Sequence, residues 1–369
     1  MPASERLSVV VVGGSLVGLA AAVALGGVGL RVEVFERSAG LLEEHGAGLG
    51  VDLEHLGRLV GDKAAELPTI DSPGRATTSW RGLYELLREQ AIATPGVTYH
   101  ESVAVQGISP SADSVTVETT GGGATVADAI VGADGYRSLI RRHVNPEAPE
   151  AEFAGYLLWR GVLDEEEVRR DPGLGARAAA VAFDPRPRVS AQGGWYLITY
   201  PIPSASGSTG PGERRLSWNW YRAEHDGQTP WPPGSRPRTV LPSQLTPGAA
   251  EEVLQASRVW SWPWPELMEL TARRGTLFVN AIYEHLPHRA ASERAVVVGD
   301  AAHVVTPMTG AGLINGFQDV LTLTRLLTGI DSRTVPEALL RYEQLRLPPA
   351  RELAAYSKSW SRQFLAGRR

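Results

Sequence analysis

Hydrophobic and polar residues follow two different patterns along the chain, and the first pattern occupies its amino-terminal part. Residues 7–12 form a continuous apolar run, a glycine-rich turn follows, and apolar positions then recur at helical spacing up to residue 25. A second apolar run covers residues 31–35. This order is typical of a strand, helix, strand unit. Because such apolar strands need cover on both faces, the pattern predicts a parallel sheet flanked by helices.

The middle of the chain follows the second pattern, in which short strand-like segments dominate. Between residues 97 and 131, alternating segments such as 114–118 and a glycine turn at 121–123 predict an antiparallel meander that ends in an apolar strand at 129–131. From about residue 153 to 278, Trp, Tyr and Pro are concentrated in strand-like runs. We expect a separate antiparallel sheet there.

The last part of the chain returns to the first pattern. An apolar strand at 295–298 leads into a glycine-rich segment and a helix at about 316–327, and residues from 336 onward have a helical pattern. The sequence therefore predicts an α/β fold with a Rossmann-like parallel sheet, an inserted antiparallel-sheet domain and carboxyl-terminal helices. The expected parts are residues 1–152 and 279–369 for one nucleotide-binding domain and residues 153–278 for the inserted domain.

Composition narrows the class of protein. The 369 residues are 43% hydrophobic and 21% charged, as in globular proteins. A formal charge of -5 without a basic stripe argues against a nucleic-acid partner. The absence of Cys excludes thiolate metal sites, disulfides and dithiol redox chemistry. With no secretory pattern near the amino terminus and no apolar run of the roughly 20 residues that a membrane span needs, we expect a cytoplasmic monomer or homodimer without membrane contact.

The first glycine-rich turn has the context of a dinucleotide site, because it lies between a predicted strand and a predicted helix. Its sequence is Gly13-Gly14-Ser15-Leu16-Val17-Gly18. Gly13 permits the tight turn, Gly18 permits close packing of helix on strand, and the small Ser15 replaces the usual second glycine. Glu36, about 20 residues further on, would accept hydrogen bonds from the ribose hydroxyls and repel a 2′-phosphate. A glycine turn alone is also a packing solution, but this combination favours FAD or NAD over NADP.

Two later segments add a reason to choose a flavin. Asp134-Gly135 follows one apolar strand, and Gly299-Asp300 follows another and continues through residues 307–315 into a helix. An Asp at the strand end can bind a ribityl hydroxyl. The glycines before the helix leave its first N–H groups free to face the flavin pyrimidine ring, where the reduced flavin carries negative charge.

These three segments, with Arg37, Arg137 and Arg141, resemble the three motifs of class A flavoprotein aromatic hydroxylases, in the same order and along nearly the whole chain. Within that family the middle region is most similar to 2,6-dihydroxypyridine hydroxylases, through the segments Phe153-Ala154-Gly155-Tyr156, Trp159-Arg160-Gly161-Val162-Leu163, Tyr200-Pro201-Ile202-Pro203 and Trp218-Asn219-Trp220-Tyr221. The resemblance implies FAD as the cofactor and NAD(P)H as the electron donor. The residues expected to contact FAD are Gly13, Ser15, Leu16, Gly18, Glu36, Arg37, Arg81, Asp134, Asp300, Pro307, Gly310, Ala311, Gly312, Leu313 and Asn315.

The resemblance also implies a reaction. NAD(P)H reduces FAD, O2 adds at flavin C4a, and the hydroperoxide transfers a hydroxyl group to a small electron-rich aromatic or N-heteroaromatic substrate. As base or polar anchor it favours His45, in a segment that passes close to the flavin in the family. Tyr200, Tyr221 and Arg160 compete with His45 for substrate contact. No metal is expected.

The sequence leaves several alternatives open. A flavin-dependent dehydrogenase or oxidase would use the same fold without inserting oxygen. Flavin halogenases are a weaker fit, since Trp262-Pro263-Trp264-Pro265 matches their motif only in part and the chain's two lysines, Lys63 and Lys358, lack a convincing setting. A NAD dehydrogenase explains the first motif alone, and a nucleotide-binding protein without enzymatic activity is a different class. The period-2 aromatics Trp218 and Trp220 either line a substrate pocket or pack a core.

Overall fold

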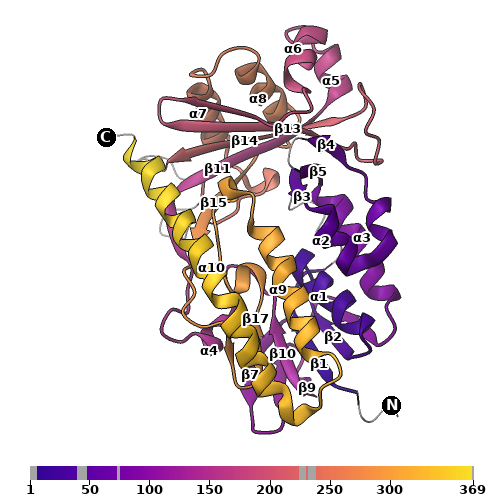
Figure 1. The fold of residues 1–369 in the computed structure, drawn as a ribbon. Helices are drawn as coiled ribbons and strands as arrows, with labels where there is room; N and C mark the ends of the chain where they lie inside the picture. Colours follow the sequence, from indigo (N-terminus) through magenta and orange to yellow (C-terminus); the bar gives the residue numbers. More distant parts are fainter. Residues whose placement is uncertain (1–5, 40–47, 73–74, 224–229, 232–237, 368–369) are drawn as a thin grey trace.

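The parallel sheet expected at the amino terminus forms the base of the molecule (Figure 1). The computed structural model describes residues 6–39, 48–72, 75–223, 230–231 and 238–367. The sheet has six strands in the order β16-β17-β10-β1-β2-β6, and the five from β17 to β6 run parallel. Their bounds are Ser8–Val12 (β1), Arg31–Phe35 (β2), Val97–His100 (β6), Ala129–Gly132 (β10), Ala291–Ser292 (β16) and Ala295–Val297 (β17).

Both faces of this sheet are covered, which explains why its central strands β1, β10 and β17 are almost entirely apolar. One face carries the helices Leu16–Gly27 (α1), Trp80–Ala93 (α3) and Gly312–Leu327 (α9). The other face carries Leu139–Val144 (α4) and a three-stranded antiparallel sheet, Val105–Pro110 (β7), Val115–Thr119 (β8) and Ala124–Ala127 (β9). The predicted meander is therefore present but shorter than expected. Residues 97–100 are not part of it, because the α3 crossover returns the chain to the sheet edge, where β6 pairs parallel to β2.

A second sheet of five antiparallel strands lies at the other end of the molecule (Figure 1). Its order is β12-β13-β14-β11-β15. The strands are Glu152–Asp164 (β11), Arg188–Gln192 (β12), Trp195–Ile202 (β13), Arg215–Ala223 (β14) and Phe278–Glu284 (β15). Its outer face is covered by the helices Glu165–Arg170 (α5), Gly175–Ala182 (α6), Pro247–Ser257 (α7) and Trp264–Arg273 (α8). Its inner face is turned toward the parallel-sheet half.

Smaller elements join the two halves. A three-stranded sheet, Gly48–Val51 (β3), Ile70–Ser72 (β4) and Arg75–Ser79 (β5), contacts β13, where the Thr77 hydroxyl donates to the Pro201 carbonyl at 2.9 Å. The helix Leu53–Val60 (α2) lies between β3 and β4 in the chain, and the long helix Val335–Ala366 (α10) runs along the side of both halves (Figure 1). Short 3₁₀ helices cover Gly61–Glu66, Pro242–Gln244, Gly299–Ala301, Pro307–Thr309 and Ser332–Thr334.

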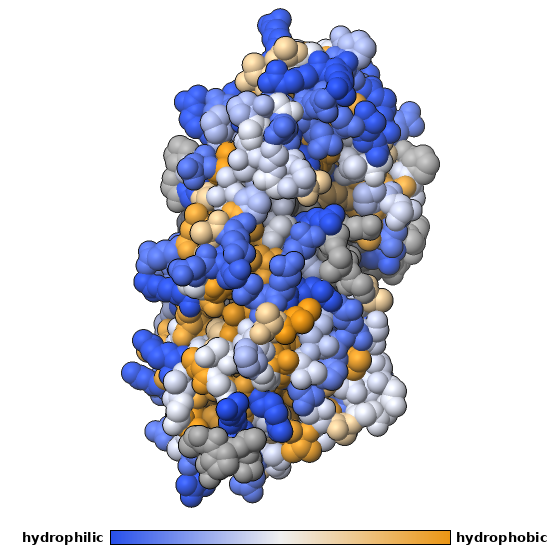
Figure 2. Space-filling model, turned by 90° about the vertical axis from the view of Figure 1, so that its right-hand side faces the viewer, coloured by the Kyte–Doolittle hydropathy of each residue, from blue (hydrophilic) through white to orange (hydrophobic). Residues whose placement is uncertain are grey.

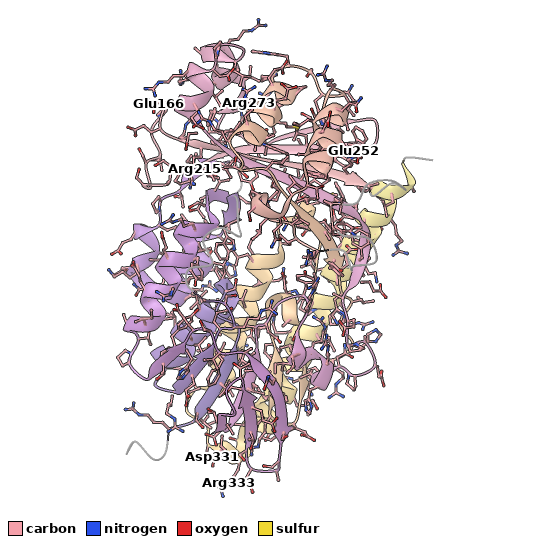
Figure 3. The ribbon with its side chains drawn as sticks, turned by 180° about the vertical axis from the view of Figure 1, so that it is seen from behind. Glu166, Arg215, Glu252, Arg273, Asp331 and Arg333 are labelled. Atoms are coloured by element: carbon pink, nitrogen blue, oxygen red, sulfur yellow. The ribbon has the colours of Figure 1, made fainter. Side chains whose placement is uncertain are left out.

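The surface is most polar at the five-stranded-sheet end of the molecule (Figure 2). Figure 3 shows Asp331 and Arg333, which form a 2.9 Å ion pair, at the end opposite Glu166 and Arg273. Figure 2 shows hydrophilic side chains predominating over the five-stranded-sheet end, with hydrophobic ones interspersed elsewhere on that face. Among the helices in the described ranges, none combines the length and the apolar character needed to cross a bilayer.

Candidate active site and cofactor groove

The turn between β1 and α1 is so tight that two of its positions require glycine. Gly13 has a φ of +104°, and its amide donates a 2.9 Å hydrogen bond to the Phe35 carbonyl. A Cβ atom on Gly13 would lie 2.4 Å from the Ala133 carbonyl oxygen, and one on Gly18 would lie 1.9 Å from the Gly13 oxygen. Both clashes are with backbone, which cannot rotate away. The turn therefore has the close backbone approach that a dinucleotide pyrophosphate site requires.

Glu36 holds the end of β2 against this turn. Its carboxylate accepts hydrogen bonds from the backbone amides of Gly14 and Ser38, each at 2.7 Å, and the residue is only 6% exposed. Two backbone donors fix the orientation of the carboxylate. The side chain is therefore held at the carboxyl end of the strand, where a ribose would lie.

A groove opens at the carboxyl ends of β1, β2 and β10. Its volume is about 630 Å³. The lining residues come from the first two motifs and from the start of α3 and β7; they are Val12, Gly13, Ser15, Phe35, Glu36, Arg37, Ser38, Trp80, Val103, Ala104, Val105, Ala133, Asp134, Gly135, Tyr136, Arg137, Leu139 and Arg142. Two segments about 100 residues apart in sequence thus share one cavity, at the sheet edge where doubly wound folds bind nucleotides.

Asp134 shapes the floor of this groove. Its carboxylate accepts hydrogen bonds from the Ser138 hydroxyl at 2.5 Å and from the Leu139 amide at 2.6 Å. Burial raises the pKa of Asp134, and these hydrogen bonds to the ionised form oppose that shift. Asp134 therefore fixes the loop that leads into α4 in addition to lining the groove.

Arg141 joins the second motif to the third. The side chain is fully buried, and its guanidinium donates to the backbone carbonyls of Ala301 at 3.1 Å and Asp300 at 3.4 Å. It also donates to the Tyr136 carbonyl at 2.5 Å and the Pro149 carbonyl at 3.0 Å. One side chain thus satisfies carbonyls from three loops, which holds the Asp134 and Asp300 segments next to each other.

A buried ionic cluster, with side chains from α9 and from the helix that follows it, supports the Gly299–His303 segment. The Asp319 carboxylate accepts from the Gly299 amide at 3.0 Å, from His303 Nε2 at 2.7 Å and from Arg346 Nε at 2.7 Å. Burial alone would raise the pKa of Asp319, but the adjacent His303 and Arg346 lower it. Burial alone would lower the pKa of His303, but the negative charge of Asp319 outweighs burial, so the pKa of His303 is raised. His303 is therefore a structural residue, part of the support for Asp300.

Asp300 itself is turned toward the start of α9. The residue as a whole is exposed, but protein atoms close to the side chain desolvate the carboxylate, and this raises the pKa of Asp300. A Cβ atom on Gly312 would lie 4.0 Å from its Oδ1. Asp300 and the first turn of α9 therefore border the same space, as hydrogen bonds to a ribityl chain and a flavin ring would require.

The first turn of α9 presents free backbone donors. Gly310, with a φ of +61°, ends the 3₁₀ turn that precedes the helix, and the methyl side chain of the capping residue Ala311 makes no capping hydrogen bond. The first N–H groups of a helix have no partner within the helix and carry partial positive charge. Arg75 Nη1 donates to the Gly310 carbonyl at 2.9 Å, and Asn315 Nδ2 donates to the Ala311 carbonyl at 3.1 Å.

The inner face of the five-stranded sheet carries a polar cluster that meets β3. Arg160 donates to Asn219 Oδ1 at 2.8 Å and to the Gly48 carbonyl at 3.3 Å. The Tyr200 hydroxyl donates to the same carbonyl at 2.7 Å, and the Gly48 amide donates to Ser217 Oγ at 3.2 Å. We call Gly48, Arg160, Tyr200, Ser217 and Asn219 the inner-face cluster. It brings together strands β3, β11, β13 and β14.

Comparisons with known proteins agree with this geometry. Residues 153–283 match the family model described as FAD binding domain-like, and residues 282–357 match the model described as FAD binding domain. The chain is 27% identical to 2,6-dihydroxypyridine 3-monooxygenase of Paenarthrobacter nicotinovorans, over 89% of this chain and 84% of the relative. It is 28% identical to aurachin C monooxygenase/isomerase of Stigmatella aurantiaca, over 95% and 88%.

Solved structures give the same result. The structure of 2,6-dihydroxypyridine-3-hydroxylase from Arthrobacter nicotinovorans aligns with a TM-score of 0.81 at 25% identity, over 98% of this chain and 93% of that chain. A salicylate hydroxylase substrate complex aligns with a TM-score of 0.74 at 18% identity, which supports the fold. The chain belongs to the class A flavoprotein aromatic hydroxylases.

FAD, the cofactor of these aromatic hydroxylases, fits the residues present. The glycine turn and Glu36 suit an adenosine diphosphate, and Asp300 with the uncapped α9 suits a ribityl chain and an electron-rich ring. Within the described part of the chain, no group of three or more His, Asp or Glu side chains is arranged to hold a metal ion.

The aromatic residues of β14 divide between the two faces of the sheet, as the alternation predicts. Trp218 and Trp220 lie on the outer face in the core with α7 and α8, where the Trp218 indole donates to Thr271 Oγ1 at 2.9 Å. Their role in this protein is core packing, so the pocket-lining alternative is wrong for them. Asn219 and Tyr221 lie on the opposite, inner face.

The structure places two further candidate residues, Tyr221 and Arg81, away from the open groove. Tyr221 is buried against Tyr156, and burial raises the pKa of its phenol, which stays protonated. Arg81 donates to Glu85 at 2.9 Å near the start of α3, and is not among the residues that line the groove. His45 lies outside the described residues.

Sequence reasoning missed three positions that help to build this candidate site. Arg75 crosses from β5 to the Gly310 carbonyl, and Asp319 and Arg346 support the Asp300 segment from α9 and α10. Charged residues in amphipathic helices are usually solvent-exposed, so no local signal marks Asp319 or Arg346 as buried partners. Only the tertiary packing of α9 on α10 brings them together.

Proposed function

We propose that the protein uses NAD(P)H and O2 to hydroxylate a small electron-rich aromatic or N-heteroaromatic ring that binds at the inner face of the five-stranded sheet. The observation that carries the proposal is the inner-face cluster, which concentrates polar side chains on the sheet face against which Met308, just before α9, packs. Bound FAD would supply the redox chemistry, carrying two electrons from NAD(P)H to O2 so that one oxygen atom enters the ring and the other leaves as water.

Arg160 is the residue best suited to hold the substrate. Its guanidinium is half-buried, lies 5.6 Å from the Phe278 ring centroid and is oriented by Asn219 and Gly48. A rigid cation of this kind favours an oxyanion over the neutral phenol or lactam. Ionisation of a ring hydroxyl makes the ring more nucleophilic, which is the property that attack on an electrophilic oxygen requires.

The same face also excludes water around the ring. Leu158, Ile198 and Ile282 are apolar neighbours there, together with Met308 from the loop before α9. An apolar wall with a few fixed polar groups is typical of small-molecule sites. It would also protect the oxygenating species from unproductive loss of hydrogen peroxide.

Tyr200 and Tyr221 have positioning roles in this proposal. The Tyr200 hydroxyl is engaged by the Gly48 carbonyl, so it fixes β3 against the sheet. Tyr221, as a neutral phenol, keeps the bottom of the site uncharged. His45 is proposed as a base on the resemblance alone; a His45→Ala variant that hydroxylates at the wild-type rate would remove it from the mechanism.

The experiment that tests the proposal is oxygen labelling. Purified enzyme with FAD and NAD(P)H is screened against hydroxylated benzenes, hydroxypyridines and related N-heterocycles for stimulated NAD(P)H oxidation, and a hit is repeated under ¹⁸O2. The proposal expects one ¹⁸O atom in the product, found by mass spectrometry. An oxidised product without ¹⁸O would replace it with a dehydrogenase or oxidase.

Arg160→Gln tests the proposed anchor, with Arg222→Gln as the matched control. Arg222 lies on the opposite face of the same sheet, where it pairs with Glu252 at 2.7 Å. We expect Arg160→Gln to raise the KM for the substrate about tenfold, the equivalent of about 1.4 kcal/mol, with FAD content unchanged. Equal effects of the two variants would remove Arg160 from the substrate site.

A further inference from the structure

Helix α10 contacts both halves of the molecule and has a different set of partners in each. In its first half, the Tyr342 hydroxyl donates to the Val297 carbonyl of the parallel sheet at 3.1 Å. In its second half, Lys358 pairs with Glu152 at 2.7 Å and Phe364 packs on Tyr156 with 5.1 Å between ring centroids. The second half of α10 is therefore attached to the five-stranded sheet (Figure 1).

Between these contacts, Thr306 is held from two directions. Its backbone amide donates to Ser357 Oγ of α10 at 2.8 Å. Its hydroxyl lies 2.7 Å from the Tyr156 hydroxyl of β11, and it accepts a 3.3 Å hydrogen bond from the Met308 amide. Thr306 is fully buried and begins the segment that leads through Gly310 to the first turn of α9.

A buried carboxylate orders the other hydroxyl groups of this cluster. Glu284 is 4% exposed and accepts from Ser357 at 2.6 Å and from Ser361 at 3.0 Å. Ser361 Oγ lies 2.9 Å from the Tyr156 hydroxyl. Because a carboxylate only accepts, both serine protons are directed at Glu284. Burial raises the pKa of Tyr156 to about 12, so its phenol keeps a proton to share.

We propose that Tyr156, Ser357 and Ser361 are positioning residues, which act through Thr306 to hold residues 307–311 and the first turn of α9 at a fixed distance from the inner face of the sheet. The inference rests on the proposed function, because it assigns these residues the task of setting where the FAD pyrimidine ring lies relative to the substrate. None of them borders the groove or belongs to the inner-face cluster.

The connectivity explains why a buried polar cluster occurs here. A purely apolar contact between α10, β11 and the Thr306 segment would permit small sliding movements, whereas directional hydrogen bonds from three elements define one arrangement. Reaction geometry at a cofactor is sensitive to displacements of about 1 Å. The cluster is thus placed to define the segment that contacts the ring.

Tyr156→Phe and Ser361→Ala test the inference, with Tyr196→Phe as the matched control. Tyr196 belongs to the same aromatic cluster and packs on Phe364, so the control removes a phenolic hydroxyl from the same environment. The readouts are the Kd of FAD, titrated into apoprotein by fluorescence, the visible circular dichroism of bound FAD, and the Tm of the apoprotein. We expect Tyr156→Phe and Ser361→Ala to raise the Kd about fivefold, as for one lost hydrogen bond, and to change the visible spectrum.

A merely structural role would give a different pattern. In that case Tyr156→Phe would lower the apoprotein Tm but leave the FAD Kd and the visible spectrum as in wild type and Tyr196→Phe, and the inference would be overturned. The proposed function fails separately, if wild-type enzyme with bound FAD inserts no ¹⁸O into any product. The Kd and the spectrum do not depend on that result.

Discussion

The parallel-sheet half and the five-stranded-sheet half specify their parts of the site in different ways. In the first half, backbone geometry determines which residues can form the site. A Cβ atom on Gly13 would lie 2.4 Å from a carbonyl oxygen, so the cofactor turn requires glycine at this position. In the second half, the site is formed by side chains on one face of the sheet. Arg160 is oriented for its proposed role only by its hydrogen bonds to Asn219 and Gly48. A site built from backbone can be recognised in the sequence, whereas one built from side chains depends on which face is turned inward.

The largest effect is expected from a glycine of the first half. Gly13→Val adds a clash with backbone at a φ of +104°, and we expect loss of more than about 4 kcal/mol of stability, with FAD absent from the purified protein. The matched control is Gly193→Ala in the second half. Gly193 also has a positive φ, +58°, but a Cβ there would meet no atom within 4 Å.

For the control, urea unfolding should show a loss of only about 1–2 kcal/mol, the cost of placing a side chain in left-handed backbone. FAD content, measured from absorbance after release, should be unchanged. Comparable FAD content in Gly13→Val and Gly193→Ala would contradict the claim that the first half is specified by its backbone.

Two adjacent residues of β14 test the claim that the sheet faces differ. Trp220 is fully buried on the outer face against Trp195 and Trp260, and Trp220→Ala should cost about 3–5 kcal/mol in urea unfolding. Asn219→Ala, on the inner face, should cost about 1 kcal/mol but lower kcat/KM about tenfold by releasing Arg160, the proposed substrate anchor.

The reverse ranking for β14 would refute this assignment of faces. If Asn219→Ala unfolds the protein more readily than Trp220→Ala, the inner face is the core. The value of kcat/KM per FAD-loaded molecule separates the two effects, since it does not count unfolded protein.

A smaller, pH-dependent effect is expected where the halves meet. Burial, with the nearby positive charge of Arg141, lowers the pKa of His285 from 6.5 to about 4. The unfolded chain therefore binds a proton between these values that the folded protein does not, so stability falls as the pH falls from 6.5 to 4. The loss attributable to His285 is at most about 3 kcal/mol.

The matching variant is His285→Gln, which cannot take up that proton. Urea unfolding at pH 7 and pH 4.5 should show a smaller loss of stability for the variant than for wild type. Identical losses in the two proteins would mean that His285 titrates alike in the folded and unfolded states.

The smallest effect concerns Arg81, which the family resemblance assigns to the flavin. Its 2.9 Å pair with Glu85 joins side chains that are 45% and 39% exposed, so Arg81→Ala should change stability by less than about 1 kcal/mol. If Arg81 turns to the cofactor when FAD binds, the FAD Kd should rise about threefold, the equivalent of about 0.7 kcal/mol. A wild-type Kd would exclude Arg81 from the cofactor site.

The sequence predicts the first half of the molecule in some detail, because each signal is local. The apolar run at 8–12, the glycines that follow and Glu36 lie within one strand, helix, strand unit, and the structure has that unit with β1 beside β2. The prediction for residues 97–100, as part of the antiparallel meander, is wrong for the opposite reason. Its pairing partner, β2, is some 60 residues away and no local pattern identifies it.

The same limit applies to the side-chain sites. Alternation along β14 correctly separates Trp218 and Trp220 from Asn219 and Tyr221, but it cannot say which set faces a ligand. The sequence offers no marker for Arg75 beside Gly310, or for Ser357 and Ser361 beside Glu284. These contacts join positions more than 70 residues apart.

The central claim is that three distant segments form one FAD site, and direct measurement of the bound cofactor tests it most simply. The purified protein, incubated with FAD and passed through a desalting column, should keep about one flavin per chain, with absorbance bands in the visible and with FAD identified by mass after denaturation. Asp300→Ala should lose that flavin. A wild-type protein that retains no FAD under these conditions would contradict the account.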